Sequence, residues 1–174
     1  SSKEADGSIP KALPQKPQGI MLKFYSMEIV FQEIPDEISL AINITNCPNL
    51  CPNCHSPWLR EDIGEVLTRE IIDNTIQKYK NQITCILFMG GDHSLEDIID
   101  LSYYIKESHK GIKTAWYSGQ NKIPKLQPNN PLNYIKTGEY QEEKGGLNNP
   151  KTNQRLYKLE TQERQDITYR FWRK

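Results

Sequence analysis

Hydrophobic and polar positions along the chain follow two periodicities, one typical of strands and one typical of helices. Residues 38–46, ISLAINITN, are rich in β-branched side chains, and residues 84–90, TCILFMG, form a continuous apolar run. These patterns predict buried β-strands, the second of which is covered on both faces as in a parallel sheet. Upstream, residues 24–35, FYSMEIVFQEIP, predict an opening hairpin or a short strand.

Two helices are predicted where apolar residues recur at helical spacing after a residue that favours a helix start. Thr68 is a candidate N-cap of a helix that extends to about Lys80. Ser94 and Asp97 resemble a capping box, with Asp in place of the usual Glu or Gln, and predict a helix that extends to about His109.

Three later segments are predicted to be strands. They are residues 113–119 (KTAWYSG), 132–140 (LNYIKTGEY) and, as a short last strand, 154–160 (QRLYKLE). Strands that alternate with helices over short connections form right-handed crossovers and a parallel sheet. The expected fold class is therefore α/β with a mostly parallel sheet.

The first 20 residues, SSKEADGSIPKALPQKPQGI, differ from the rest of the chain. They contain three prolines and three lysines but few large apolar side chains, so they bury too little surface to offset the entropy lost on ordering. We expect residues 1–20 to be a flexible tail, a linker or a remnant of cloning. Residues 21–174 are expected to form one folded domain.

Charge and hydropathy narrow the class of protein. The 174 residues carry 22 Lys and Arg against 22 Asp and Glu, a formal net charge of zero. This balance argues against a protein that coats nucleic acid or an anionic membrane. No apolar run approaches the roughly 20 residues of a membrane-spanning helix, and the chain does not begin with a signal-peptide core. We therefore expect a cytoplasmic protein with no nucleic acid and no membrane as partner.

Three cysteines crowd the segment CPNLCPNCHSPW, residues 47–58. Cys47, Cys51 and Cys54 have the spacing CxxxCxxC, and His55 follows at once. Three thiolates at this spacing can ligate three irons of a four-iron cubane and leave one iron open. The fourth cysteine, Cys85, lies in the apolar run and is expected to be a small buried residue.

Zinc and unmetallated thiols are the alternatives to a cluster. A structural zinc site needs four ligands, usually as two separated pairs, and no second pair follows this motif. Cys54 and His55 are adjacent in sequence, which makes joint ligation of one ion awkward. Reduced core or redox thiols remain a third interpretation.

Three candidate motifs each follow a predicted strand. Cys47, the run Gly90-Gly91-Asp92 and the pair Ser118-Gly119 stand just beyond three strand ends. Ligands of parallel α/β sheets gather at this carboxyl edge, so the motifs are expected to converge there. Glycine lets the backbone approach a ligand closely, and Asp92 adds an acceptor for a cation. A plain turn is the alternative explanation of the Gly-Gly-Asp and Ser-Gly motifs.

These motifs carry a resemblance to a known superfamily. CxxxCxxC after the first main strand, followed by Gly-Gly-acid after the next, resembles the radical S-adenosylmethionine superfamily, and CPNLCPNCHSPW resembles its glycyl-radical-activating branch. More specifically, the chain is similar to activating proteins of anaerobic ribonucleoside-triphosphate reductases from about residue 28 to 160. The segments that carry this similarity are FMGGDHSL, TAWYSG, YIKTGEYQEE and GGLNNPKTNQRLYKL.

The resemblance implies a fold, two cofactors and an activity. The fold would be a single-domain partial (open) β/α barrel of the radical-SAM type, with a [4Fe-4S] cluster on Cys47, Cys51 and Cys54. S-adenosylmethionine would bind the open iron and be cleaved by one electron to methionine and a 5′-deoxyadenosyl radical. That radical would take hydrogen from a glycine of the partner reductase. No catalytic side chain beyond the cluster is implied, because the cofactor carries the chemistry.

Further residues are expected to contact the cofactors. His55 could donate a hydrogen bond to a cluster sulfur, and Asn153 and Arg155 could place donors near the cofactor's carboxylate or the partner's glycyl loop. The full set of expected cofactor-binding residues is Gly90, Gly91, Asp92, Ser118, Gly119, His55, Asn153 and Arg155.

Two departures from the family pattern concern the partner and the adenine. The family usually carries a Gly-Pro-Gly element before the cluster strand, where this chain has residues 32–40, QEIPDEISL. Asn53 stands before the third cysteine, where many members carry an aromatic residue against adenine. Adenine is therefore expected to bind elsewhere, near Trp116 or Tyr117.

The resemblance implies an anaerobic ribonucleoside-triphosphate reductase as partner and an electron donor of the flavodoxin or ferredoxin type. Residues 120–131, QNKIPKLQPNNP, and the exposed rim are candidate partner contacts. Two alternative functions stay open: another radical S-adenosylmethionine enzyme, such as a pyruvate formate-lyase activase, and a small zinc-binding interaction module that is not an enzyme.

Overall fold

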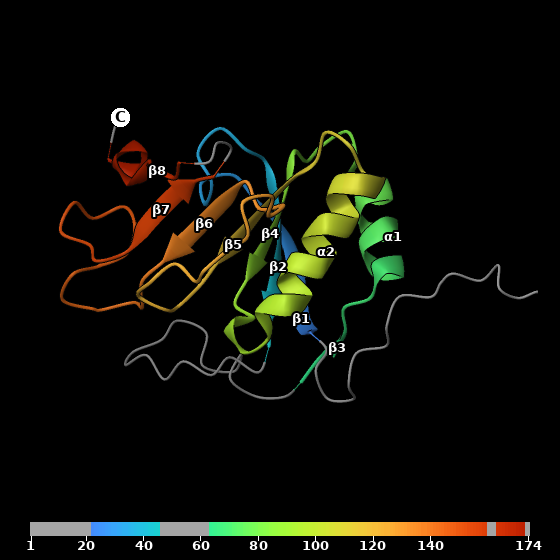
Figure 1. The fold of residues 1–174 in the computed structure, drawn as a ribbon, viewed down its shortest axis with the longest axis horizontal. Coiled ribbons are helices and arrows are strands. Elements are labelled where there is room, and N and C mark those ends of the chain that lie inside the picture. The colour runs from blue at the N-terminus through green and yellow to red at the C-terminus, as the bar shows by residue number, and fades with distance from the viewer. Residues whose placement is uncertain (1–21, 46–62, 160–162, 173–174) are drawn as a thin grey trace, which may run out of the picture.

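One open sheet with the strand order β3-β1-β2-β4-β5-β6-β7-β8 organises the computed structural model, which describes residues 22–45, 63–159 and 163–172 (Figure 1). Its strands are β1 (Lys23–Val30), β2 (Ser39–Ile44), β3 (Glu65–Val66), β4 (Cys85–Met89), β5 (Lys113–Tyr117), β6 (Tyr134–Thr137), β7 (Arg155–Lys158) and β8 (Gln165–Asp166). The helices are α1 (Arg69–Tyr79), α2 (Leu95–Ser108) and the short 3₁₀ turns η3 (Asp92–Ser94) and η4 (Thr168–Phe171).

The centre of the sheet is parallel. Strands β2, β4, β5 and β6 are neighbours in that order and run parallel, whereas β1 and β3 on one side and β7 and β8 on the other pair antiparallel. The predicted α/β class with an open, mostly parallel central sheet is therefore confirmed. Of the two alternatives predicted for residues 24–35, the strand is the one observed: β1 covers most of this segment and pairs antiparallel with β2.

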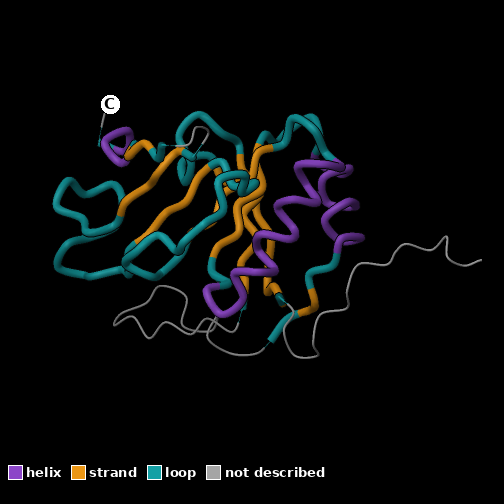
Figure 2. The backbone as a smooth tube through the Cα atoms, in the orientation of Figure 1, coloured by secondary structure: helices purple, strands orange, loops and turns teal. Residues whose placement is uncertain are grey.

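Both long helices cover the same face of the sheet. Figure 1 shows α1 and α2 side by side, and Figure 2 shows mostly loops around β6, β7 and β8, with the short turn η4 at the C-terminal end. Ile76 of α1 and Ile98 of α2 pack in one buried cluster with Phe88 of β4. On the opposite face, Leu87 of β4 packs with Ile34 from the loop after β1, without a residue of either long helix in that buried cluster.

The start of α1 follows the sequence prediction, and the start of α2 differs from it. Thr68 Oγ1 accepts a hydrogen bond from the Ile71 amide at 3.1 Å, which is an N-cap. Ser94 precedes α2, but its hydroxyl donates to Asp97 Oδ2 and does not cap a backbone amide. The predicted capping box is wrong in this detail because η3 leads into α2, and the Ser94 amide donates to Gly91 O.

Strand β6 is shorter than the predicted segment 132–140. Gly138 follows its last residue with φ +103°, and a Cβ at that position would lie 2.9 Å from Gln154 Cα, so the chain turns there. The predicted tail, residues 1–20, lies outside the described residues. Within the described ranges, no helix is long and apolar enough to cross a membrane.

Candidate functional site

The candidate site lies at the carboxyl edge of the parallel strands. Residues 90–92 follow β4 and residues 118–119 follow β5 at this edge, where η3 also lies. The segment that begins after β2 contains the predicted cluster ligands. Cys47, Cys51, Cys54 and His55 fall outside the described residues, so their roles stay predictions.

Two consecutive left-handed glycines turn the chain at the end of β4. Gly90 and Gly91 have φ values of +97° and +91°, which L side chains rarely adopt. A Cβ on Gly91 would lie 3.0 Å from Ile98 Cδ1 of α2. Conformation and space therefore both require glycine here. The Gly90 amide donates to Tyr117 O at 3.0 Å, and the Trp116 indole Nε1 donates to Gly90 O at 2.7 Å.

Asp92 ties this turn to the end of β5. Its Oδ1 accepts a hydrogen bond from Ser118 Oγ, and its Oδ2 accepts one from the Gly119 amide at 2.9 Å. The two motifs are thus brought together, as the strand order predicted. Because both carboxylate oxygens accept these hydrogen bonds, Asp92 holds the ends of β4 and β5 together at this edge, which we call the rim. Its predicted contact with a cofactor cation stays a prediction.

A buried lysine that the sequence analysis missed lies at the same edge. Lys136 of β6 is 8% exposed, and its ammonium donates to Ser118 O at 3.1 Å and to Gly138 O at 2.8 Å. It also lies 5.6 Å from the centre of the Tyr117 ring. Lysine is seldom fully buried without a role for its charge. The signal available in the sequence was a single charge within a predicted strand.

Asn153 and Arg155 reach different surroundings. The Asn153 Nδ2 atom donates to Glu139 O at 3.0 Å, while Asn153 Oδ1 is buried and has no hydrogen-bond partner in the described part of the chain. The Arg155 guanidinium lies 3.7 Å from Asp166 Oδ2, and its central carbon lies over the Trp172 ring, 6.0 Å from the ring centre. Asn153 thus retains an acceptor for a ligand near the end of β6, whereas the contacts of Arg155 give no support to its predicted cofactor role.

A hollow of about 770 Å³ opens on the sheet face opposite the helices. Met89 and Tyr117, the last residues of β4 and β5, form part of its wall. The Tyr117 hydroxyl donates to Glu33 O, and burial raises the pKa of Tyr117 well above its ordinary value. Other lining residues are Gln32, Pro35, Tyr140, Leu147 and Phe171.

The two aromatic residues expected near adenine therefore face different ways. Trp116 is 2% exposed, packs on the helix-covered face and has its indole engaged by Gly90. It has no open ring face for stacking. Tyr117 lines the hollow instead, so of the two it is the one within reach of a ligand on this face.

The described residues fit the amino-acid end of S-adenosylmethionine. That end carries an ammonium and a carboxylate. The rim offers a buried cation in Lys136, an unpartnered acceptor in Asn153 Oδ1 and a backbone turn where a Cβ would be obstructed. A cation and an unpartnered acceptor at one strand edge suit the carboxylate and the ammonium of a zwitterionic ligand.

Comparisons with known proteins place the chain in a family. Residues 38–157, more than half of the chain, match the protein family described as "4Fe-4S single cluster domain". No curated protein matches the chain in sequence. The crystal structure of QueE from Escherichia coli is similar at 12% sequence identity and a TM-score of 0.49. The similarity covers 72% of this chain and 64% of the QueE chain, which is less than two thirds of its length.

Proposed function

Because the chain belongs to the family of 4Fe-4S single cluster domains, we propose that it is a radical S-adenosylmethionine activase. Its [4Fe-4S] cluster would be held by Cys47, Cys51 and Cys54, which have the spacing CxxxCxxC. Its substrate would be a glycine of an anaerobic ribonucleoside-triphosphate reductase. The observation that carries the proposal is the glycine turn, held by Asp92, at the edge of the sheet where β2, the strand before the cysteines in sequence, ends.

A bound, reduced cluster on the three cysteines would supply the one electron needed for reductive cleavage of S-adenosylmethionine to methionine and a 5′-deoxyadenosyl radical. The protein binds and orients the cofactor at the rim. Lys136 would hold the methionine carboxylate, because its ammonium is a buried cation beside the end of β5. Asn153 Oδ1 would accept a hydrogen bond from the methionine ammonium or a ribose hydroxyl.

The hollow opposite the helices would receive the partner's glycine segment. Its volume of about 770 Å³ is sufficient for several residues of an extended chain, and its wall begins at the ends of β4 and β5. The side chains of Met89, Tyr117 and Leu147 form the apolar part of this wall, beside polar residues such as Gln32 and Asn148. Hydrogen transfer from the glycine Cα to the 5′-carbon needs no general base, so no acid–base pair is required here.

The segment in place of the family's Gly-Pro-Gly element lies along this hollow. Gln32, Glu33 and Pro35 belong to residues 32–40 and line it. We therefore assign partner contacts to this segment in addition to the loop 120–131. A flavodoxin- or ferredoxin-type donor would supply the electron, and a cytoplasmic location is part of the same proposal.

Electron paramagnetic resonance tests the proposal directly. Anaerobically reconstituted protein, S-adenosylmethionine, a strong reductant and purified anaerobic reductase should give a glycyl radical signal. The matched control is Cys51→Ala, which removes one cluster ligand and should abolish both the iron content and the signal. A signal that persists in Cys51→Ala would refute the proposal.

Two further arms of this experiment separate the alternatives. A glycyl radical formed on pyruvate formate-lyase, and not on the reductase, would identify the other activase. About one zinc per chain, with no iron and no bound S-adenosylmethionine, would identify the zinc-binding module.

A further inference from the structure

A hydrogen bond between the Trp116 indole and the Gly90 carbonyl connects the helix-covered face of the sheet with the glycine turn of the candidate site. Trp116 pairs with Phe88 across β4 and β5 and is buried on the helix-covered face. Its Nε1 atom reaches past the end of β4 and donates to Gly90 O at 2.7 Å. A buried indole N–H requires an acceptor, and this one is a backbone carbonyl in the turn of the candidate site.

This hydrogen bond fixes the direction of the next amide. The peptide bonds described are trans, so the C=O of Gly90 and the N–H of Gly91 point in opposite directions within one plane. Because Gly90 O points toward Trp116, the Gly91 N–H points away from the indole. Within the part of the chain that the structure describes, no acceptor is recorded for the Gly91 amide.

The remaining groups of the turn are engaged. The Gly90 amide donates to Tyr117 O, and Gly91 O accepts from the Ser94 amide. Both oxygens of Asp92 accept hydrogen bonds from residues 118 and 119. The turn therefore offers a ligand a donor, the Gly91 amide. This differs from the sequence expectation, which treated the motif as a source of acceptors for a cation.

We propose that Trp116 is a positioning residue, which holds the Gly90–Gly91 peptide so that the Gly91 amide donates to the carboxylate of S-adenosylmethionine. This inference rests on the proposed function, since it assumes that cofactor. The carboxylate is the negatively charged hydrogen-bond acceptor of the cofactor. A backbone donor that is already held in place binds this carboxylate without further ordering of the chain. Glycine at position 91 also lets the turn pack closely against Ile98 of α2, because it has no Cβ to meet that side chain.

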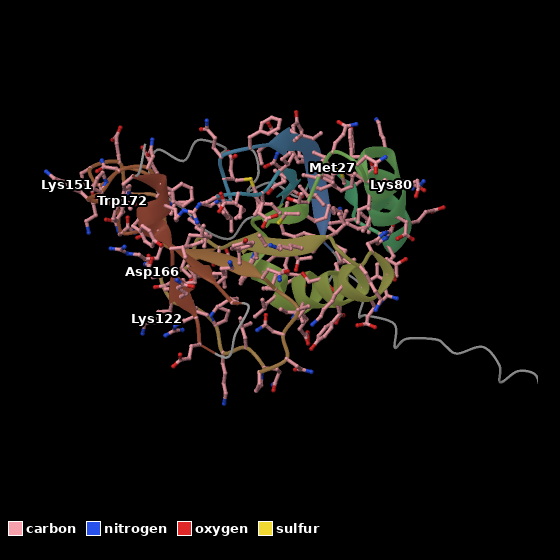
Figure 3. All side chains as sticks on the ribbon, turned by 90° about the horizontal axis from the view of Figure 1, so that it is seen from above. Met27, Lys80, Lys122, Lys151, Asp166 and Trp172 are labelled. Atoms are coloured by element: carbon pink, nitrogen blue, oxygen red, sulfur yellow. The ribbon has the colours of Figure 1, made fainter. Side chains whose placement is uncertain are left out.

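Trp116→Phe tests the inference, because phenylalanine retains an aromatic ring and lacks the N–H. Trp172→Phe is the matched control, because Trp172 Nε1 also donates to a backbone carbonyl, Leu147 O at 3.0 Å. Figure 3 labels Trp172 at the end of the molecule that carries the C-terminal strands. Replacement of Trp116 by 3-benzothienylalanine, an isostere without the N–H, is the second variant if phenylalanine impairs folding.

Affinity for two ligands is measured by anaerobic equilibrium dialysis on the cluster-loaded protein. S-adenosylmethionine should bind Trp116→Phe about tenfold more weakly than the wild type, and decarboxylated S-adenosylmethionine should bind both proteins equally. Trp172→Phe should bind both ligands as the wild type does. A wild-type protein that binds no S-adenosylmethionine refutes the proposed function itself. Given wild-type binding, an unchanged affinity in both Trp116 variants, or an equal loss for both ligands, overturns the positioning role.

Discussion

Asp92 accepts a hydrogen bond from Ser118 across 26 residues of sequence and thereby joins the ends of two parallel strands. The same carboxylate holds the Gly119 amide at 2.9 Å. The rim of the candidate site is therefore braced by side chains before any ligand binds. Preorganisation of this kind lowers the cost of ordering the site around a cofactor.

Ser118→Ala should loosen this brace. The variant removes a hydroxyl donor to Asp92, so we expect a loss of about 1–2 kcal/mol in the free energy of unfolding and weaker binding of S-adenosylmethionine. Urea unfolding and equilibrium dialysis measure the two effects. Ser102→Ala is the control, because Ser102 Oγ donates to Ile98 O within α2. Equal cofactor affinity in wild type and Ser118→Ala would contradict a role of the brace in binding.

Lys136→Met should weaken cofactor binding as well as stability. Methionine keeps the unbranched apolar stem and removes the buried ammonium, so Ser118 O loses a donor and the free energy of unfolding should fall by about 1–3 kcal/mol. We expect the dissociation constant for S-adenosylmethionine to rise about tenfold or more, with the iron content unchanged. Lys122→Met, at an exposed lysine labelled in Figure 3, should bind as the wild type does. A Lys136→Met protein with wild-type affinity would rule out the carboxylate contact.

Cys85 should be chemically inert and dispensable for the cluster. It is fully buried and free, and burial raises the pKa of its thiol to about 12. Almost no reactive thiolate exists at neutral pH. Iodoacetamide should leave Cys85 unmodified in the folded protein, as mass spectrometry would show. Cys85→Ala should retain its iron, in contrast to Cys51→Ala; rapid labelling, or loss of iron from Cys85→Ala, would disprove this.

Glu37 should stabilise the opposite edge of the sheet without affecting the cofactor. Its carboxylate accepts hydrogen bonds from Thr84 Oγ1 at 2.6 Å, Lys113 Nζ at 2.9 Å and the Tyr134 hydroxyl at 2.8 Å. These residues lie at the amino ends of β4, β5 and β6. Glu37→Gln should lower the free energy of unfolding by about 1–3 kcal/mol and leave the affinity for S-adenosylmethionine unchanged. A large loss of affinity would show that the two edges are coupled.

Tyr104 should stabilise the contact between α1 and α2 in a pH-dependent way. Its hydroxyl donates to Asp73 Oδ2 at 2.6 Å, and this hydrogen bond raises the pKa of Tyr104 above its ordinary value of 10.0. Because the folded pKa is the higher one, the stabilisation is complete below pH 10 and is lost as the pH rises through the folded value. Tyr104→Phe should thus destabilise the protein at pH 7.5, and progressively less as the pH is raised above 10. Urea midpoints over that pH range measure this, and a difference that stays constant would contradict it.

Most elements of the fold were predictable because their signals are local. The apolar run at residues 84–90 became β4, and Thr68 became the N-cap of α1. The errors arose where a neighbouring segment intervenes. Strand β6 ends early because Gly138 turns against Gln154, and Ser94 does not cap α2 because η3 precedes it.

The candidate site was only partly predictable. Residues 90–92 and 118–119 were found because they follow predicted strands that are parallel neighbours. Lys136 was missed because a lone charge in a short strand has no local pattern that reports its burial. The register of β5 and β6, which pairs Tyr117 with Lys136, brings its ammonium to Ser118 O.

The sequence by itself determined most of the strands of the sheet and which cysteines are spaced for a cluster, because backbone propensity and side-chain periodicity act over a few residues. The tertiary structure alone decided which polar groups meet at those ends. The hydrogen bonds of Trp116 to Gly90 and of Ser118 to Asp92 each span 26 residues. They exist only because parallel pairing places the ends of β4 and β5 at the same edge of the sheet. No local sequence pattern specifies a contact between residues that far apart in sequence.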